Sequence, residues 1–370
     1  MKPGGFLCMV LTIPGFVLCW VLPTIASHLL HTSGQYTALV AQAGIATLCF
    51  AWPWLGVAGT VLATAITYGL HVAGADHAAL VGSTIWAAMT LVNWGVRFPY
   101  SPSLTRLLFW LDMSSYFETC ELRGDMDSMP RSRTLFMFHP HGVITAGFSC
   151  NGIFSREFHE RTLPAECRAN AASGSWSWPE WPGTVFLLTS GLREPCHYFK
   201  VLCDLTGRME SATRANMKSL MSAGRNVALI PGGFEEATLF EFGAHRVAMR
   251  RRKGVIKYAL QHGYALQPIY TFGESRTYTT YTGMKSLRLW VNRLQVPTCL
   301  FWGDWLVPLF PRREAQCVSY VGAPLRLPRI ESPTPQQVEE WHAAYLAALQ
   351  KTFDEGKAGA GEADAVLEVW

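Results

Sequence analysis

Two imidazole groups stand at the end of an apolar run, where His139 and His141 flank Pro140 and Gly142 follows. Proline lacks an N–H group and favours extended backbone, whereas glycine can adopt a positive φ or let a ligand approach the main chain. The run therefore predicts a strand that ends in a loop, with an imidazole beside a bare backbone N–H. Such a loop could supply a general base and an oxyanion donor. The spacing alone does not separate the two histidines.

Other kinds of site compete for this histidine pair. A His-x-His pair on a strand forms half of many metal sites, but no Asp-His or His-x-x-Glu pattern follows to complete one. A serine hydrolase would need a G-x-S-x-G elbow, which the sequence lacks. We therefore expect no bound metal. A structural histidine pair and a histidine base without a covalent nucleophile are the remaining interpretations.

A second loop has a similar form, since the run NVALIPGGFEEATLF predicts a strand that leads into Gly232 and Gly233. Glu235 and Glu236 follow this turn and could orient an imidazole or face a polar substrate. A Gly-Gly turn with nearby acids is usually only a turn. Backbone N–H groups near Gly142 or Gly233 are the oxyanion candidates.

A basic run lies shortly after this loop, in the segment HRVAMRRRKGVIKYAL. It is interpreted as a phosphate-binding strip at the start of a helix, with a solvated or membrane-facing basic surface as the alternative. Its candidate residues for binding a phosphate-bearing substrate are Arg250, Arg251, Arg252, Lys253 and Lys257.

Strands and helices alternate after residue 97, which predicts an α/β body. Short apolar runs predict buried strands at residues 134–138, 184–189, 227–230, 266–271 and 317–321. The stretch GVIKYALQHG has helical periodicity, and this helix is expected to end at Gly263. A second helix is expected to begin near Ser332 and Thr334, with Pro335 in its first turn.

The chain divides near residue 97, because Lys2 and Asp76 are the only formally charged side chains among residues 1–96. Residues 1–96 are expected to form a membrane region with two to four spans, at residues 6–23, within 36–70 and at 78–96. Lys2 and Arg97 flank this region, which weakly indicates that both ends face the cytosol. A cleaved signal peptide is the alternative for its start. Residues 97–370 are expected to form a cytosol-facing domain.

Partners and compartment follow partly from composition. Ten cysteines occur without a CxxC pair, and no Asn-x-Ser/Thr sequon is present, which fits a reduced environment. A net charge of +4, without an RNP, zinc-finger or basic-helix pattern, gives no indication of a nucleic-acid partner.

The motifs together resemble the diacylglycerol acyltransferase type 2 family, which includes monoacylglycerol and wax-alcohol acyltransferases. The resemblance rests on HPHG, PGGFEEA, RRKGVIKYALQHGYALQPIYTFGE and the closing AVLEVW. It implies a glycerolipid-acyltransferase-like mixed sheet flanked by helices, preceded by a transmembrane helical region. By position His141 matches the family's catalytic loop, and we prefer it to His139 as the base. Related glycerophosphate acyltransferases carry an Asp four residues after the histidine, which neither His139 nor His141 has. The resemblance therefore implies a partner acid from elsewhere in the chain, and the candidate is Glu236, which falls on the acid of the family's Gly-Gly-x-x-Glu stretch. Further positions that match family motifs are Pro140, Glu236, Gly254, Pro268, Phe272, Gly273 and Glu274.

The resemblance also implies an activity and a location. The enzyme would transfer an acyl group from acyl-CoA to diacylglycerol to form triacylglycerol, without an acyl-enzyme and without a cofactor other than acyl-CoA as the substrate. It would reside in the endoplasmic reticulum membrane, with the lipid droplet as a second location. Monoacylglycerol or a fatty alcohol is the alternative acceptor. A metal-dependent lipid hydrolase, an inactive membrane scaffold and a homo-oligomer are further options that the sequence leaves open.

Overall fold

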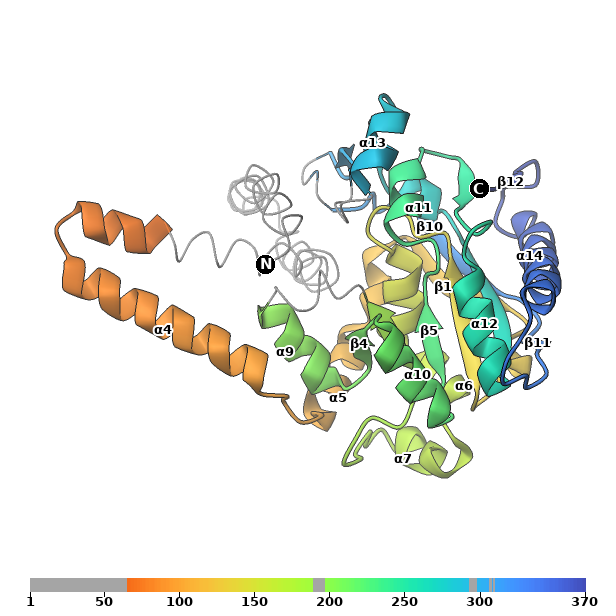
Figure 1. The fold of residues 1–370 in the computed structure, drawn as a ribbon, viewed down its shortest axis with the longest axis horizontal. Coiled ribbons are helices and arrows are strands. Elements are labelled where there is room, and N and C mark those ends of the chain that lie inside the picture. Colours follow the sequence, from red (N-terminus) through yellow and green to blue (C-terminus); the bar gives the residue numbers. More distant parts are fainter. Residues whose placement is uncertain (1–64, 189–196, 293–297, 306–307, 309) are drawn as a thin grey trace.

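A mixed β-sheet with helices on both faces forms the body of the protein in a computed structural model, which describes residues 65–188, 197–292, 298–305, 308 and 310–370 (Figure 1). The expected α/β architecture of the body is confirmed. The strands are β1 (Thr119–Gly124), β2 (Thr134–His139), β3 (Val185–Leu188), β4 (Met209–Ser211), β5 (Val227–Leu229), β6 (His245–Val247), β7 (Ala265–Phe272), β8 (Thr279–Thr280), β9 (Phe301–Trp302), β10 (Gln316–Val321), β11 (Leu325–Arg326) and β12 (Leu367–Val369).

The main sheet runs in the order β1-β10-β7-β2-β5-β3-β4, and β11 pairs with β7. Strands β7, β2, β5, β3 and β4 are parallel to one another, whereas β10 runs antiparallel to β7. The five predicted strands are confirmed as β2, β3, β5, β7 and β10, within a residue or two at each end. Since β5, β2 and β7 are parallel neighbours, their carboxyl ends meet at one edge of the sheet.

Each face of the sheet carries its own hydrophobic core, which explains why β2 is buried at all its residues. Phe136 and Phe138 lie in one core with Phe158, whereas Leu135 and Met137 lie in the other. The first core is covered by α5 (Pro102–Leu111), the π-helix η5 (Phe148–Ile153), α6 (Arg156–Thr162) and α9 (His197–Thr206). The second is covered by α10 (Arg214–Ser222), α12 (Lys253–His262) and α14 (Pro335–Lys357).

Two helix boundaries follow the sequence signals. Helix α12 ends at Gly263, whose φ of 61° is left-handed and therefore suits glycine. Helix α14 begins with a capping box, in which the Thr334 hydroxyl accepts from the Gln337 N–H and the Gln337 side chain accepts from the Thr334 N–H. Short helices complete the body: α7 (Arg168–Ala172), α11 (Gly233–Leu239) and α13 (Lys285–Asn292).

Helix α4 (Asp76–Gly95) projects from the body (Figure 1) and covers the predicted span at residues 78–96. Among the described residues, no helix is both long and apolar enough to cross a membrane. Polar residues interrupt α4, and the hydroxyls of Ser83 and Thr84 donate to carbonyl groups one turn earlier. The predicted spans at residues 6–23 and, up to residue 64, within 36–70 lie outside the described residues.

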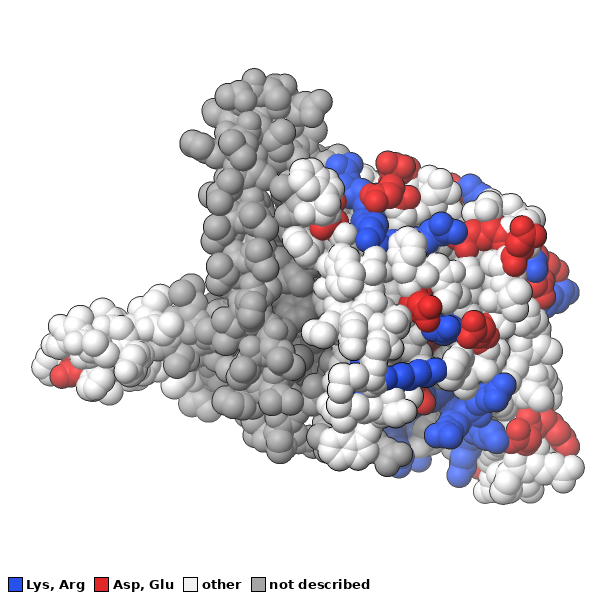
Figure 2. Space-filling model, turned by 90° about the horizontal axis from the view of Figure 1, so that it is seen from above, with Lys and Arg blue, Asp and Glu red and all other residues white. Residues whose placement is uncertain are grey.

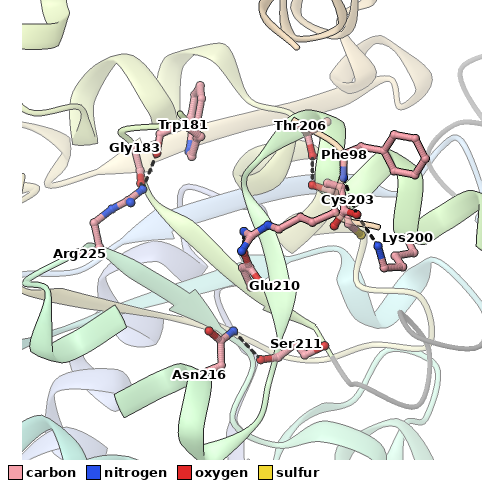
Figure 3. A network of polar contacts seen from close by, with 12 residues as sticks. Phe98, Trp181, Gly183, Lys200, Cys203, Thr206, Glu210, Ser211, Asn216 and Arg225 are labelled. Atoms are coloured by element: carbon pink, nitrogen blue, oxygen red, sulfur yellow. Dashed lines mark hydrogen bonds and ion pairs between the residues drawn. The ribbon is translucent and has the colours of Figure 1, made fainter. Parts of the chain in front are cut away.

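A polar cluster fixes the chain where it enters the body after α4 (Figure 3). The Lys200 ammonium donates to the Val96 carbonyl at 2.8 Å and to the Asp204 carboxylate at 2.5 Å. The same carboxylate accepts from the Phe98 N–H, and the side chain of Arg97 pairs with Glu210. The Asp204 carboxylate is fully buried, so these bonds tie the end of α4 to α9.

Candidate active site

Three motif loops meet at one edge of the sheet, because each follows the carboxyl end of a parallel strand. The HPHG loop follows β2, the Gly-Gly turn follows β5, and Gly273 and Glu274 follow β7. The strand register places Met137 opposite Leu229 on one side and His139 opposite Tyr270 on the other. This edge is where open α/β sheets bind their ligands.

His141 offers its imidazole at this edge. Its side chain is only partly buried, and its Nδ1 lies 3.0 Å from the Gly142 carbonyl oxygen. A carbonyl oxygen can only accept a hydrogen bond, so Nδ1 must carry the proton. The Nε2 atom then keeps its lone pair and can accept a proton. Burial lowers the pKa of His141 below 6.5, which favours this neutral form at cytosolic pH.

His139 has a different environment. It is fully buried, and its Nε2 lies 3.0 Å from the Tyr345 hydroxyl on α14. Burial lowers its pKa to about 3. Pro140 follows through a cis peptide bond. The geometry therefore favours His141 as the candidate base and gives His139 a packing role between β2 and α14.

Glu236 lies beside His141, but its contact differs from the predicted one. One carboxylate oxygen accepts from the backbone N–H of His141, and the other accepts from the Ala248 N–H at 2.9 Å. The Glu236 side chain therefore holds the main chain of the loop, and the Gly142 carbonyl orients the imidazole instead. The group is 2% exposed, and burial raises the pKa of Glu236 to about 7 against the opposing effect of its hydrogen bonds.

Glu274 holds the other end of the same loop. Its two oxygens accept from the backbone N–H groups of Ala146 at 3.0 Å and Gly147 at 2.7 Å. Burial raises the pKa of Glu274 to about 8. Two buried carboxylates, Glu236 and Glu274, thus tether the loop that carries His141 at both of its ends. The sequence placed Glu274 in a motif but did not indicate this role.

The glycines of the site are required by close approach. A Cβ at Gly142, whose φ is 62°, would lie 2.2 Å from a Glu274 oxygen, and one at Gly232 would lie 1.8 Å from a Glu236 oxygen. Among the described residues, neither the Gly142 nor the Gly233 N–H has a hydrogen-bond acceptor. These two N–H groups are therefore the candidate donors to a ligand at this edge.

The basic run begins α12, and this helix starts at the edge of the sheet where the loops meet because it precedes the parallel strand β7. Arg250, Arg251 and Lys257 are exposed. Arg252 instead binds the Gly232 carbonyl and pairs with Glu235 at 3.0 Å, and Lys253 pairs with Glu339. Figure 2 shows Lys and Arg side chains at several places on the face seen from above, interspersed with Asp and Glu, with the densest basic group toward the lower right.

The remaining motif positions lie in or next to β7 and in the first turn of α12. Pro268 and Phe272 lie buried in β7, and Gly273 has a φ of 79° where a Cβ would lie 2.1 Å from the Gln316 carbonyl oxygen. Gly254 is exposed in the first turn of α12. A surface hollow of about 240 Å³ near Trp302 and Arg312 contains none of the predicted site residues.

Sequence reasoning missed a buried polar trio behind the loop. The His245 ring lies between the Tyr270 hydroxyl, 2.9 Å from Nδ1, and the Glu362 carboxylate, 2.5 Å from Nε2. These residues are far apart in the sequence and no spacing signal relates them. Within the part of the chain that the structure describes, no group of three or more His, Cys, Asp or Glu side chains could hold a metal ion.

Comparisons with known proteins agree with the motifs. Residues 196–369 match the diacylglycerol acyltransferase family. Diacylglycerol O-acyltransferase 2 of Dictyostelium discoideum is 27% identical over 294 residues, which cover 71% of this chain and 83% of that protein. Acyl-CoA wax alcohol acyltransferase 1 of Homo sapiens is 28% identical over 258 residues, covering 67% of this chain and 73% of that protein. Human 2-acylglycerol O-acyltransferase 3 is 26% identical over 268 residues, covering 68% and 72%. No solved structure matches the chain.

Proposed function

We propose that this chain is an acyltransferase of the diacylglycerol acyltransferase family and that its reaction is acyl transfer from acyl-CoA to the free hydroxyl of diacylglycerol, with His141 as general base and no covalent intermediate. The acceptor is part of the proposal, because similar relatives carry the names of diacylglycerol, 2-acylglycerol and wax-alcohol enzymes.

The observation that carries the proposal is the geometry of His141. Its Nδ1 is bound to the Gly142 carbonyl and its ring is only partly buried, so Nε2 is the free basic atom. Catalysis by a base requires the correct protonation state and reach to the proton that is removed. The two carboxylate tethers bind main-chain N–H groups of the loop and not the imidazole.

In this proposal the acyl group moves from sulfur to oxygen in a single transfer. Nε2 of His141 takes the hydroxyl proton as the acceptor oxygen attacks the thioester carbonyl carbon. The C–O bond forms, the C–S bond breaks, and the thiolate of CoA leaves and takes the proton back from His141. A thiol with a pKa of about 8.5 leaves far more readily than an alcohol, so direct transfer needs no acyl-enzyme.

The backbone supplies the remaining stabilisation in this proposal. The N–H groups of Gly142 and Gly233 would donate to the thioester oxygen as it becomes negative, a contribution of about 10²- to 10³-fold in rate for one donor. Gly232 packs against Glu236 and sets the turn. The exposed Arg250, Arg251 and Lys257 would bind the phosphate groups of CoA. No metal or further cofactor enters this mechanism.

Residues 1–96 form the membrane region in our proposal, and residues 97–370 form the catalytic domain on the cytosolic side. We assign the enzyme to the endoplasmic reticulum membrane and the lipid droplet, where its substrates and product partition. Exposed apolar side chains on α4, such as Leu80 and Ile85, support a membrane contact there.

Acyl transfer in microsomes that carry the expressed chain tests the proposal. Labelled acyl-CoA is offered with diacylglycerol, monoacylglycerol or a fatty alcohol to the wild type, His141→Ala and a control, His262→Ala at the far end of α12. We expect triacylglycerol from the wild type and the control, and a loss of at least 10²-fold in His141→Ala. Preference for another acceptor would change the substrate and keep the chemistry. Absence of every ester product from folded wild-type protein would overturn the proposal, and loss of activity on chelation would favour a metal-dependent enzyme.

A further inference from the structure

The segment that anchors Glu236 is itself held by the last strand of the chain. Strand β6 is only three residues long and pairs in parallel with β12, with His245 opposite Leu367 and Val247 opposite Val369. The Trp370 N–H donates to the Val247 carbonyl at 2.8 Å, and the Trp370 carbonyl accepts from Arg250 at 2.7 Å. Ala248, whose N–H binds Glu236, lies between these two bonds.

The buried trio joins this segment to the central strand. Glu362 precedes β12, and its carboxylate binds Nε2 of His245 on β6. Nδ1 of the same ring binds the Tyr270 hydroxyl on β7. His245 is 5% exposed and Tyr270 is not exposed at all, whereas the Glu362 side chain is 10% exposed and also pairs with Arg276 at 3.4 Å. A buried hydrogen-bonded network of this kind fixes the relative position of the elements that carry it.

These contacts close a ring that includes the catalytic loop. Tyr270 lies opposite His139 in the register of β7 and β2, and His141 follows two residues later. On the other side, His245 begins β6, and Ala248 follows directly after this strand. The Ala248 N–H donates to one oxygen of Glu236, and the other oxygen accepts from the His141 N–H. A displacement of β6 would therefore move Glu236 and, with it, the main chain of His141. On the opposite side, Tyr270 lies on β7, which is paired with β2.

The geometry points to Glu362, His245 and Tyr270 as positioning residues that fix the catalytic loop through β6 and Glu236. All three side chains are 10% exposed or less, so we assign them an effect on His141 through the loop and not on the reacting atoms. The role of His141 in this inference rests on the proposed function, whereas the mechanical link from Glu362 to the loop does not. A displacement of about 1 Å at a reacting group can cost about 10²-fold in rate.

The full-length chain is compared as wild type, Glu362→Ala, Glu362→Gln and Glu355→Ala. Glutamine keeps an oxygen that accepts from His245 Nε2, whereas alanine leaves this ring nitrogen unpaired. Glu355 lies on α14 with its carboxylate largely exposed, so it is a matched control for loss of one negative charge. Two measurements are made: kcat and KM per folded enzyme, and hydrogen exchange of the peptide that covers residues 139–149.

We expect Glu362→Ala to lower kcat about 10- to 100-fold with the KM for acyl-CoA within about twofold, and to accelerate exchange in residues 139–149. Glu362→Gln should recover most of both, and Glu355→Ala should match the wild type. Unchanged exchange in the loop of Glu362→Ala would overturn the inference whatever the activity. So would a loss in Glu362→Gln as large as in Glu362→Ala. An inactive wild type with the expected exchange pattern would overturn the proposed function alone.

Discussion

Replacing Glu236 by glutamine should separate catalysis from stability. The carboxylate accepts two backbone hydrogen bonds, from His141 and Ala248, and an amide can accept only one of them. Its NH₂ group then faces the second N–H, which loses its partner. Because one of the two tethered groups is the main chain of His141, the substitution acts directly on the position of the candidate base.

Two opposing effects decide the stability of this variant. Burial raises the pKa of Glu236 from 4.5 to about 7, which corresponds to about 3 kcal/mol of unfavourable free energy for the carboxylate above that pH. Glutamine removes this charge and leaves one buried N–H unpaired, at a cost of about 1–3 kcal/mol. The unfolding free energy above pH 7 should therefore rise by about 0–2 kcal/mol.

Activity should respond differently, because no compensating effect restores the tether. We expect kcat of Glu236→Gln to fall about 10- to 100-fold while the KM for acyl-CoA stays within about threefold. Steady-state acyl transfer at saturating acyl-CoA measures this at pH 8, and thermal unfolding of the same preparations gives the folded fraction.

Glu235→Gln is the matched control, since Glu235 is the neighbouring acid and its carboxylate is 40% exposed in an ion pair with Arg252. Such a pair contributes about 0–1 kcal/mol, so stability and kcat should remain close to the wild type. If Glu236→Gln retained the wild-type kcat, or if both variants lost activity equally, the assignment of Glu236 as the tether of the loop would be refuted.

Further expectations follow from the other tether, a glycine and the basic strip. The pKa of Glu274 is raised from 4.5 to about 8, so between these values the folded chain keeps a proton that the unfolded chain releases. The unfolding free energy should fall as pH rises through this window, and Glu274→Gln should weaken this pH dependence. Equal shifts of the thermal midpoint between pH 5.5 and 8.5 in the wild type and in Glu274→Gln would contradict this expectation. In Gly147→Ala, the new Cβ would lie 2.2 Å from the Thr271 hydroxyl oxygen, so unfolding should show a loss of about 1–3 kcal/mol; an unchanged unfolding free energy would show that the site can relax. Joint replacement of Arg250 and Arg251 by glutamine should raise the KM for acyl-CoA about 3- to 30-fold at low salt, with kcat unchanged; an unaltered KM would remove the strip from CoA binding.

The sequence predicted the strands well because the central strands are buried on both faces. Runs such as TLFMF have no polar alternation, and a parallel sheet covered by helices is the structure that accepts them. The signals at Gly263 and Thr334 are local, so they too could be read without tertiary information. The short strands β6 and β12 escaped prediction, because three residues give no periodicity and their pairing joins distant segments.

The site was predicted by residue type more reliably than by role. His141, Glu236 and Glu274 are brought together, but only the structure shows that both acids bind main-chain N–H groups. A carboxylate that follows a glycine turn looks the same in sequence whether it contacts an imidazole or a backbone. The distinction depends on where the neighbouring strand ends, which is set by sheet register.

This distinction has a chemical consequence for His141. A carboxylate on Nδ1 would stabilise the imidazolium and raise the pKa of the ring, whereas a neutral carbonyl fixes the tautomer with less effect on charge. Because burial lowers the pKa of His141 below 6.5, the neutral imidazole is favoured near pH 7. In the mechanism that we propose, such a weaker base suffices, because the leaving group is a thiolate that needs little protonation to depart. Glu236 and Glu274 therefore fix the position of the loop through its main chain, and they do so without a hydrogen bond to the His141 ring that would raise its pKa.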